Sequence, residues 1–359
     1  MKASAHTSTV VLVLSLTACG GSGSGGGGSN SLAAPSAPQT PAAPTVKISE
    51  SNAKQIASSA TDNTNVTLGA GQVGGAVAKG VNFAPNLPSL NPPSLGVLIV
   101  AESQLLLATS AGNDFSRSSV RAVNANTQTV NCSISGSIAV TPADTNGNGF
   151  MDAGDKLTVQ ANNCVDTYTL GANTFRETVN GTLAYAITKT SGSPGTTNFQ
   201  FGASVTLTNV TVTDNNGAST SNGAFNFVLT RTPTAEIVAV DSGNLSVVAN
   251  GDTATLSGFA VNRTDNLATN AYSETFSGTA TDPVLGTYSI STLNAFTGIG
   301  TAKPTSGKLK ITGDKSSLVI VPQPSGVAVL LGVDKDNDGV TDATITTTWS
   351  ELESLAATF

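Results

Sequence analysis

From about residue 117 onward, apolar and polar residues alternate with a period of two, and turn-forming residues interrupt this alternation at strand-length spacing. Clear alternating runs cover residues 182–188, 199–212, 224–230, 253–261 and 317–321. The turn signals are Asn180-Gly181, residues 214–217, Asn222-Gly223, residues 241–243 and residues 250–252. Short turns join antiparallel neighbours, so the pattern predicts a mainly β domain over residues 116–359. We expect an antiparallel meander that forms a barrel or a sandwich.

Charged residues are scarce in this chain. Asp, Glu, Lys and Arg make up 11% of the 359 residues, and the formal net charge is −7. The Lys and Arg residues form no cluster, and phosphate binding needs a basic face. The composition therefore argues against nucleic acid as a partner, and also against peripheral binding to anionic lipid.

The first 18 residues have the pattern of an export signal. Lys2 supplies a positive charge, and residues 10–16 form an apolar run that is too short to span a membrane. The sequence Leu16-Thr17-Ala18-Cys19 resembles the lipobox of bacterial lipoproteins. This resemblance implies that a signal peptide of residues 1–18 is removed and that Cys19 becomes the first residue, acylated with fatty acids such as palmitate.

The residue after the anchor cysteine indicates a destination. Gly20 stands where an Asp would favour retention in the inner membrane. The resemblance therefore implies a lipid-anchored protein of the outer membrane, on either its periplasmic face or the cell surface. The alternative is an ordinary cleaved leader in which Cys19 is incidental.

Two further parts separate the anchor from the β domain. Residues 19–46 are rich in Gly, Ser, Ala and Pro, which predicts an extended tether. Residues 47–115 predict a small, partly helical N-terminal portion. It contains a short helix within residues 47–62, capped by Ser49 or Ser51, and a buried helix over residues 95–108.

Cysteine parity predicts a disulfide. If Cys19 carries lipid, Cys132 and Cys164 remain as an even pair in an oxidising compartment. They are 32 residues apart. A bond between them would stabilise the fold by about 3–4 kcal/mol in the chain-entropy model.

The residues between these two cysteines predict a β-hairpin with a cation at its tip and the disulfide at its base. Oxygen ligands fall at positions 1, 3, 5, 7, 9 and 12 of an EF-hand-type calcium loop, with Gly149 at the turn. These ligands are Asp144, Asn146, Asn148, the carbonyl of Phe150, Asp152 and Asp155. An Asp replaces the usual Glu at position 12, and strands replace the flanking helices. The loop therefore resembles those of dockerins and thrombospondin type-3 repeats.

A second acidic loop covers residues 334–342. Its candidate ligands are Asp334, Asp336, Asp338, the carbonyl of Val340, and Asp342. Position 12 is Ile345, so a further ligand has to come from Glu351 or from water. Asp, Asn and Gly also make good turns without any metal, which is the alternative for both loops. The regular spacing favours Ca²⁺ in a structural role.

Few residues suggest catalysis. The single histidine, His6, lies in the predicted signal peptide, so the mature chain has no histidine-based triad and no imidazole zinc site. We expect a non-enzymatic, lipid-anchored envelope protein with a calcium-stabilised β domain that serves adhesion, envelope structure or binding of a protein or glycan partner. A surface lipoprotein that binds carbohydrate or another small ligand is the first alternative, and a histidine-free hydrolase is the second. Trp349 is expected to be buried against the sheet.

Overall fold

The computed structural model describes residues 45–63, 127–147, 152–170, 173–192, 197–214, 217–249, 251–300 and 302–356. The predicted signal peptide, Cys19, most of the tether and the helix predicted over residues 95–108 lie outside these ranges. The described chain is mainly β, as the alternation predicts.

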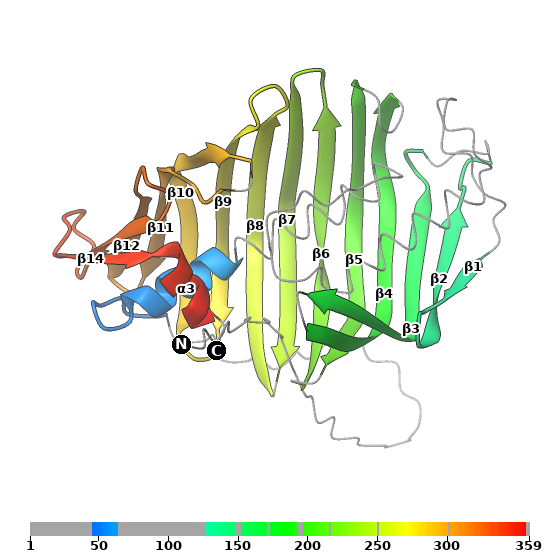
Figure 1. Ribbon diagram of the computed structural model, residues 1–359, viewed down its shortest axis with the longest axis horizontal. Helices are drawn as coiled ribbons and strands as arrows, with labels where there is room; N and C mark the ends of the chain where they lie inside the picture. Colours follow the sequence, from blue (N-terminus) through cyan, green and yellow to red (C-terminus); the bar gives the residue numbers. More distant parts are fainter. Residues whose placement is uncertain are drawn as a thin grey trace, which may run out of the picture.

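Within the described residues, fourteen antiparallel strands form one sheet in the order of the sequence, with β1 and β14 at its two edges. This confirms the predicted meander, and Figure 1 shows it as a broad, curved layer. The strands are β1 (Gln128–Asn131), β2 (Ser135–Ala143), β3 (Lys156–Leu170), β4 (Asn173–Gly192), β5 (Phe199–Asp214), β6 (Gly217–Arg231), β7 (Ala235–Ala249), β8 (Asp252–Asn266), β9 (Ala271–Asp282), β10 (Gly286–Ile299), β11 (Ser306–Gly313), β12 (Ser316–Pro322), β13 (Ala328–Asp334) and β14 (Ala343–Thr348).

Two of the predicted turns are confirmed and three are wrong. The chain reverses between β5 and β6 and between β7 and β8, at the two turn signals predicted there. By contrast, Asn180-Gly181 lies inside β4, Asn222-Gly223 inside β6, and residues 241–243 inside β7. The pairing of these strands with their neighbours shifts register at these points, so the residues form β-bulges within long strands.

The asparagines of these bulges hold residues on the preceding strand in a left-handed conformation. Asn163 on β3 has a φ of 45°, and its amide donates to Oδ1 of Asn180 over 2.7 Å. The same contact recurs two strands later. Asn209 on β5 has a φ of 48°, and its amide donates to Oδ1 of Asn222 over 2.7 Å.

The glycines of the same pairs make room for the following strand. A Cβ at Gly181 would lie 2.4 Å from the carbonyl oxygen of Asn209, and one at Gly223 would lie 2.1 Å from that of Asn244. No side chain fits at such distances. The Asn-Gly pairs therefore fix a line of bulges across the sheet, where the strands bend and twist.

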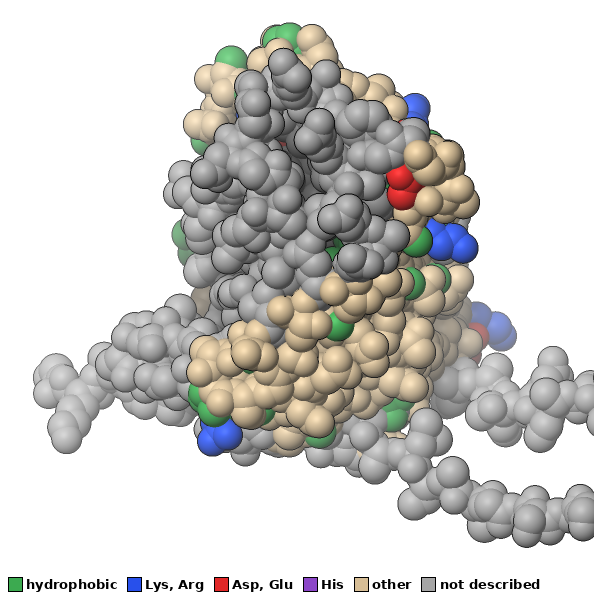
Figure 2. Space-filling view, turned by 90° about the vertical axis from the view of Figure 1, so that its right-hand side faces the viewer, with side chains coloured by type: hydrophobic (Ala, Val, Ile, Leu, Met, Phe, Trp, Pro, Cys, Tyr) green, Lys and Arg blue, Asp and Glu red, His purple; other side chains and the backbone are tan. Residues whose placement is uncertain are grey.

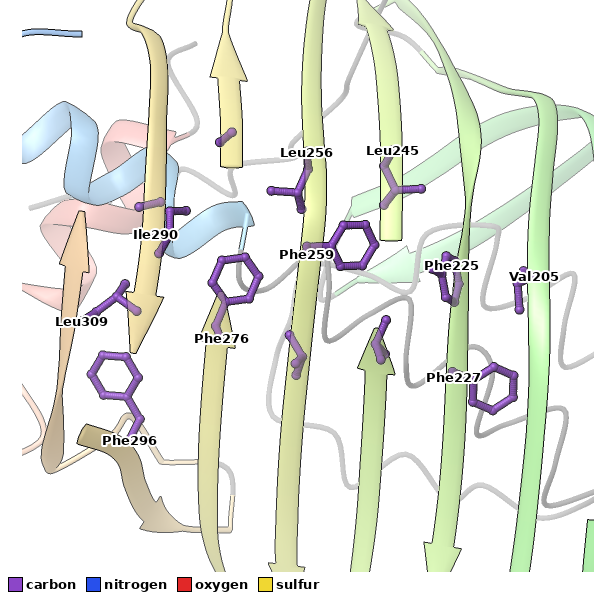
Figure 3. Packing of buried hydrophobic residues seen from close by; sticks show 14 of the residues in the cluster. Val205, Phe225, Phe227, Leu245, Leu256, Phe259, Phe276, Ile290, Phe296 and Leu309 are labelled. Atoms are coloured by element: carbon purple, nitrogen blue, oxygen red, sulfur yellow. The ribbon is translucent and has the colours of Figure 1, made fainter. Parts of the chain in front are cut away.

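A hydrophobic core covers one face of the sheet. Figure 3 shows its side chains gathering on this face along several neighbouring strands. Phe227 is 1% exposed and packs at 5.7 Å between ring centroids against Phe201, while Phe225 packs at 6.4 Å against Phe259. In the second half of β6, alternate residues are buried, as period two requires.

Two helices pack on the core at the C-terminal end of the sheet, as Figure 1 shows. One covers residues 53–63, and the other is α3 (Trp349–Ala356). Ile56 and Leu352 are both fully buried, and the hydroxyl of Ser58 donates to the carbonyl of Leu352 over 2.6 Å. Trp349 is 8% exposed, which confirms its predicted burial. Within the described residues, no helix is both long enough and apolar enough to cross a membrane.

The predicted cap of the first helix is wrong. The carbonyl of Asn52, rather than Ser49 or Ser51, accepts the first helical hydrogen bond, from the amide of Ile56 over 3.0 Å. The side chain of Asn52 instead accepts from the amide of Ser49 over 2.8 Å. It thereby fixes the turn that leads into the helix.

Figure 2 views the molecule from the β1–β3 edge. Its described surface consists mostly of backbone and uncharged side chains, with isolated charges.

Candidate metal centre

The acidic loop 334–342 forms the tip of the β13–β14 hairpin. Val333 pairs with Ala343, and the amide of Asp342 donates to the carbonyl of Val333 over 2.8 Å. Between these residues the backbone turns tightly, with Asn337 at a φ of 59° and Gly339 at 91°. The tight turn brings the alternating Asp side chains towards one another.

Three of the predicted ligands come together in this loop. Asp334, Asp336 and Asp338 each place one carboxylate oxygen within 4.8 Å of the others. In the part of the chain that the structure describes, they are the one group of three or more Asp, Glu, Cys or His residues this close. Asp334 is only 6% exposed, whereas Asp336 and Asp338 face solvent.

The buried carboxylate of Asp334 is only half satisfied. Its Oδ2 accepts from the amide of Gly339 over 3.0 Å and from the hydroxyl of Ser317 over 3.3 Å. Its Oδ1 is buried and has no hydrogen-bond partner among the residues that the structure describes. Burial opposes ionisation, but the loop amides, led by that of Gly339, outweigh it and hold the pKa of Asp334 below its ordinary value. A buried anionic oxygen without a partner is costly, and a cation would satisfy it.

The remaining loop ligands flank this group. Asp342 accepts the amide of Lys335 on Oδ2 over 2.7 Å, and Asp338 accepts the amide of Val340 on Oδ1 over 2.7 Å. These bonds hold the loop closed. Coordination by Asp342 and by the carbonyl of Val340 stays a prediction.

Glu351 does not supply the further ligand. It lies beyond Thr348, which pairs with Ala328 at the opposite end of the hairpin from Asp334. Its carboxylate is held by Lys54, at 2.5 Å, and by the hydroxyl of Thr347, at 2.7 Å. Ile345, at position 12, packs against the hydrophobic core. Water is therefore the remaining candidate for the last position.

The first acidic loop is closed by hydrogen bonds. Asp155 is fully buried, and its two carboxylate oxygens accept the amides of Thr145, over 2.7 Å, and Asp152, over 2.8 Å. Asp144 accepts the amide of Gly147 over 2.7 Å.

Part of this first loop lies outside the description. Asn146 donates to Asp152 over 2.8 Å, but Asn148 and Phe150 are not among the described residues. A cation in this loop stays a prediction.

The predicted disulfide is present at the base of the first hairpin. Cys132 and Cys164 are bonded, with their Cα atoms 5.4 Å apart. The pairing of β2 with β3 begins near the disulfide, where Ser135 lies opposite Val165, and ends where Ala143 lies opposite Lys156. The acidic loop follows at the other end, so the predicted order of disulfide, strands and loop is confirmed.

A second charged cluster lies on β8 and β9, and the sequence analysis did not find it. Arg263 pairs with Asp265 at 2.9 Å and with Glu274 at 3.4 Å. The Arg263 guanidinium also lies over the ring of Tyr272, 4.4 Å from its centroid. Burial, opposed by attraction to Arg263, raises the pKa of Glu274 to about 7. Only the strand register reveals this cluster, because Arg263 is paired directly opposite Glu274.

Comparison with protein-family models, with curated proteins and with solved structures found no match to this chain.

Proposed function

We propose that this chain is a non-enzymatic, lipid-anchored protein of the outer membrane whose β domain is stabilised by Ca²⁺ in the loop 334–342. Its role would be adhesion, envelope structure or binding of a partner. The observation that best supports a metal site is the buried Oδ1 of Asp334. This oxygen has no hydrogen-bond partner among the described residues, and the carboxylates of Asp336 and Asp338 lie close to Asp334. Hard oxygen ligands in an irregular arrangement suit Ca²⁺, whose coordination geometry is flexible, better than Mg²⁺, which demands a near-ideal octahedron.

A structural role follows from the position of the loop. It joins β13 to β14, the edge strand that leads directly into α3. Trp349 and Leu352 of α3 are buried in the core. A cation that holds this hairpin closed therefore stabilises the C-terminal cover of the sheet. Weak sites of the extracellular kind, with dissociation constants of about 10⁻⁴–10⁻³ M, are filled where calcium is plentiful.

The metal is tested by titrating the mature chain with Ca²⁺ in a calorimeter and by thermal unfolding. At 10–100 times the dissociation constant, binding should stabilise the fold by about 1.4–2.7 kcal/mol. For a domain of this size that raises Tm by about 3–10 °C. The variant Asp336→Asn/Asp338→Asn should lose this increase, since both side chains are exposed ligands.

A matched control is Asp252→Asn, because Asp252 is exposed beside another hairpin turn and should leave the increase unchanged. If neither heat nor a Tm change is observed up to Ca²⁺ concentrations of about 0.1 M, the proposed metal site is refuted.

The lipid anchor is tested separately. Intact mass spectrometry of the membrane-extracted protein should show a chain that begins at Cys19 and carries fatty acyl groups. The variant Cys19→Ala should stay unacylated and leave the membrane fraction. A wild-type chain without acyl mass would refute the anchor and leave the metal site untouched.

A further inference from the structure

The acidic loop lies next to the segment by which the domain is joined to its predicted tether. Residues 45–52 precede the first helix and lie on the sheet, where Val46 is 8% and Ile48 is 1% exposed. The amide of Val46 donates to the carbonyl of Thr287 over 3.0 Å, and the carbonyl of Val46 accepts the amide of Asp314 over 2.6 Å. We call residues 45–52 the junction segment.

Two adjacent serines connect the junction segment to the acidic loop. The hydroxyl of Ser316 accepts the amide of Ile48 over 2.8 Å, in a buried contact. The hydroxyl of its neighbour, Ser317, donates to Oδ2 of Asp334 over 3.3 Å, also in a buried contact. Ser316 and Ser317 are 0% and 1% exposed, so water cannot replace either partner easily.

A third contact joins the acidic loop and the junction segment at the protein surface. Lys335 follows Asp334 in the loop, and its ammonium group lies 2.5 Å from the carboxylate of Glu50 in the junction segment. Both side chains are about half exposed, so this ion pair contributes little energy by itself. It does fix Lys335 on the side of the loop that faces the junction segment.

We propose that Ca²⁺ in the loop 334–342 and docking of the junction segment are coupled, so that each strengthens the other. This inference rests on the proposed metal site. A cation on Asp334 Oδ1 holds the carboxylate in place and keeps Oδ2 on Ser317. Without the cation, a buried carboxylate with one orphaned oxygen gains by moving towards water, and the Ser317 contact is lost. Ser316 directly precedes Ser317 in the chain, so its hydrogen bond with the amide of Ile48 weakens as well.

Coupling of this kind is reciprocal. If Ca²⁺ strengthens docking by some factor, docking must raise Ca²⁺ affinity by the same factor. Calcium would then control how firmly the junction segment, where the tether ends, is held on the sheet. A loss of calcium would lengthen the effective tether by releasing the junction segment.

The first experiment measures hydrogen exchange at residues 45–52 of the mature chain, in millimolar Ca²⁺ and in chelator. The proposal expects the amides of Val46 and Ile48 to exchange at least about fivefold faster in chelator, the lower limit of typical coupling. Amides of β6, far along the sheet, should change less and serve as the internal reference.

The second experiment measures the reverse direction by calorimetry. Ser316→Ala removes the acceptor of the Ile48 amide without touching any metal ligand, and should weaken Ca²⁺ binding by about three- to tenfold. Ser325→Ala is the matched control, because Ser325 bonds backbone amides in the β12–β13 turn at the opposite end of those strands. It should leave the affinity unchanged.

The outcomes separate the two proposals. Ca²⁺ binding with equal exchange at residues 45–52, or with equal affinity in Ser316→Ala, overturns the coupling and leaves the metal site standing. No Ca²⁺ binding by the wild-type chain overturns both. If Ser316→Ala unfolds, Glu50→Gln at the exposed ion pair replaces it, with a smaller, about twofold loss expected.

Discussion

Replacing Glu274 with Gln should reduce the loss of stability that the wild-type protein undergoes as the pH rises. Glu274 lies on β9, is 7% exposed, and faces Arg263 across the β8–β9 pair. Asp265 on β8 and Tyr272 on β9 are further titratable groups that interact with it, while its partner on β10 is Phe296. Burial, partly offset by Arg263, raises the pKa of Glu274 from 4.5 to about 7.

The sign of the effect follows from proton binding. A raised pKa means that the folded state binds this proton more tightly than the unfolded state does. The stabilisation is therefore complete below pH 4.5 and is lost as the pH rises through about 7. Raising the pKa from 4.5 to about 7 corresponds to roughly 3 kcal/mol, at 1.36 kcal/mol for each pKa unit.

Urea denaturation at pH 5 and pH 8 measures this difference. The wild-type protein should lose up to about 3 kcal/mol between the two pH values, and Glu274→Gln should lose clearly less. Asp62 also has a raised pKa, of about 6, because of burial, so a smaller slope remains in the variant.

Glu236→Gln is the matched control for this measurement. Glu236 also lies opposite an arginine, Arg231 on the neighbouring strand, but at 3.8 Å. This variant should keep the wild-type slope. Equal slopes in wild type and Glu274→Gln would refute the reasoning.

Three further perturbations test the fold. Alanine at both Cys132 and Cys164 should lower the free energy of unfolding by about 3–4 kcal/mol, measured in urea under oxidising conditions; an unchanged midpoint would contradict the role of the disulfide. Phe227→Ala should cost about 3–5 kcal/mol in the same assay, because a fully buried ring leaves a cavity. Gly223→Ala should lower Tm far more than Gly147→Ala, since both glycines have positive φ but only the first has backbone within 4 Å of the new Cβ.

The meander could be predicted because its cause is local. Period two assigns each residue to one face, and short turns leave antiparallel neighbours as the only pairing. The position of each turn could not be predicted in the same way. Asn180-Gly181 and Asn222-Gly223 have the chemistry of a turn, a positive φ and a side-chain carbonyl, but a bulge uses both properties too. Which one forms depends on the neighbouring strand, which is distant in sequence.

The candidate metal centre could likewise be predicted only in part from the sequence. The spacing of Asp334, Asp336 and Asp338 predicts their convergence, because one tight loop carries all three. Ser317 could not be inferred, because it meets Asp334 only through strand register. The Arg263–Glu274 cluster was missed for this reason as well. The junction segment could not be inferred either, because its contacts with Ser316 and Lys335 join residues far apart in the sequence.

The two acidic loops have similar sequences but different needs for a cation. Each contains one buried carboxylate, Asp155 in the first loop and Asp334 in the second. In the first, backbone amides satisfy both oxygens of the buried carboxylate, so the loop closes on its own hydrogen bonds. In the second, strand β13 holds Asp334 beside Ser317, and one buried oxygen is left without a partner. The proposed Ca²⁺ at residues 334–342 is therefore favoured over a cation in the first loop by this unpartnered carboxylate oxygen.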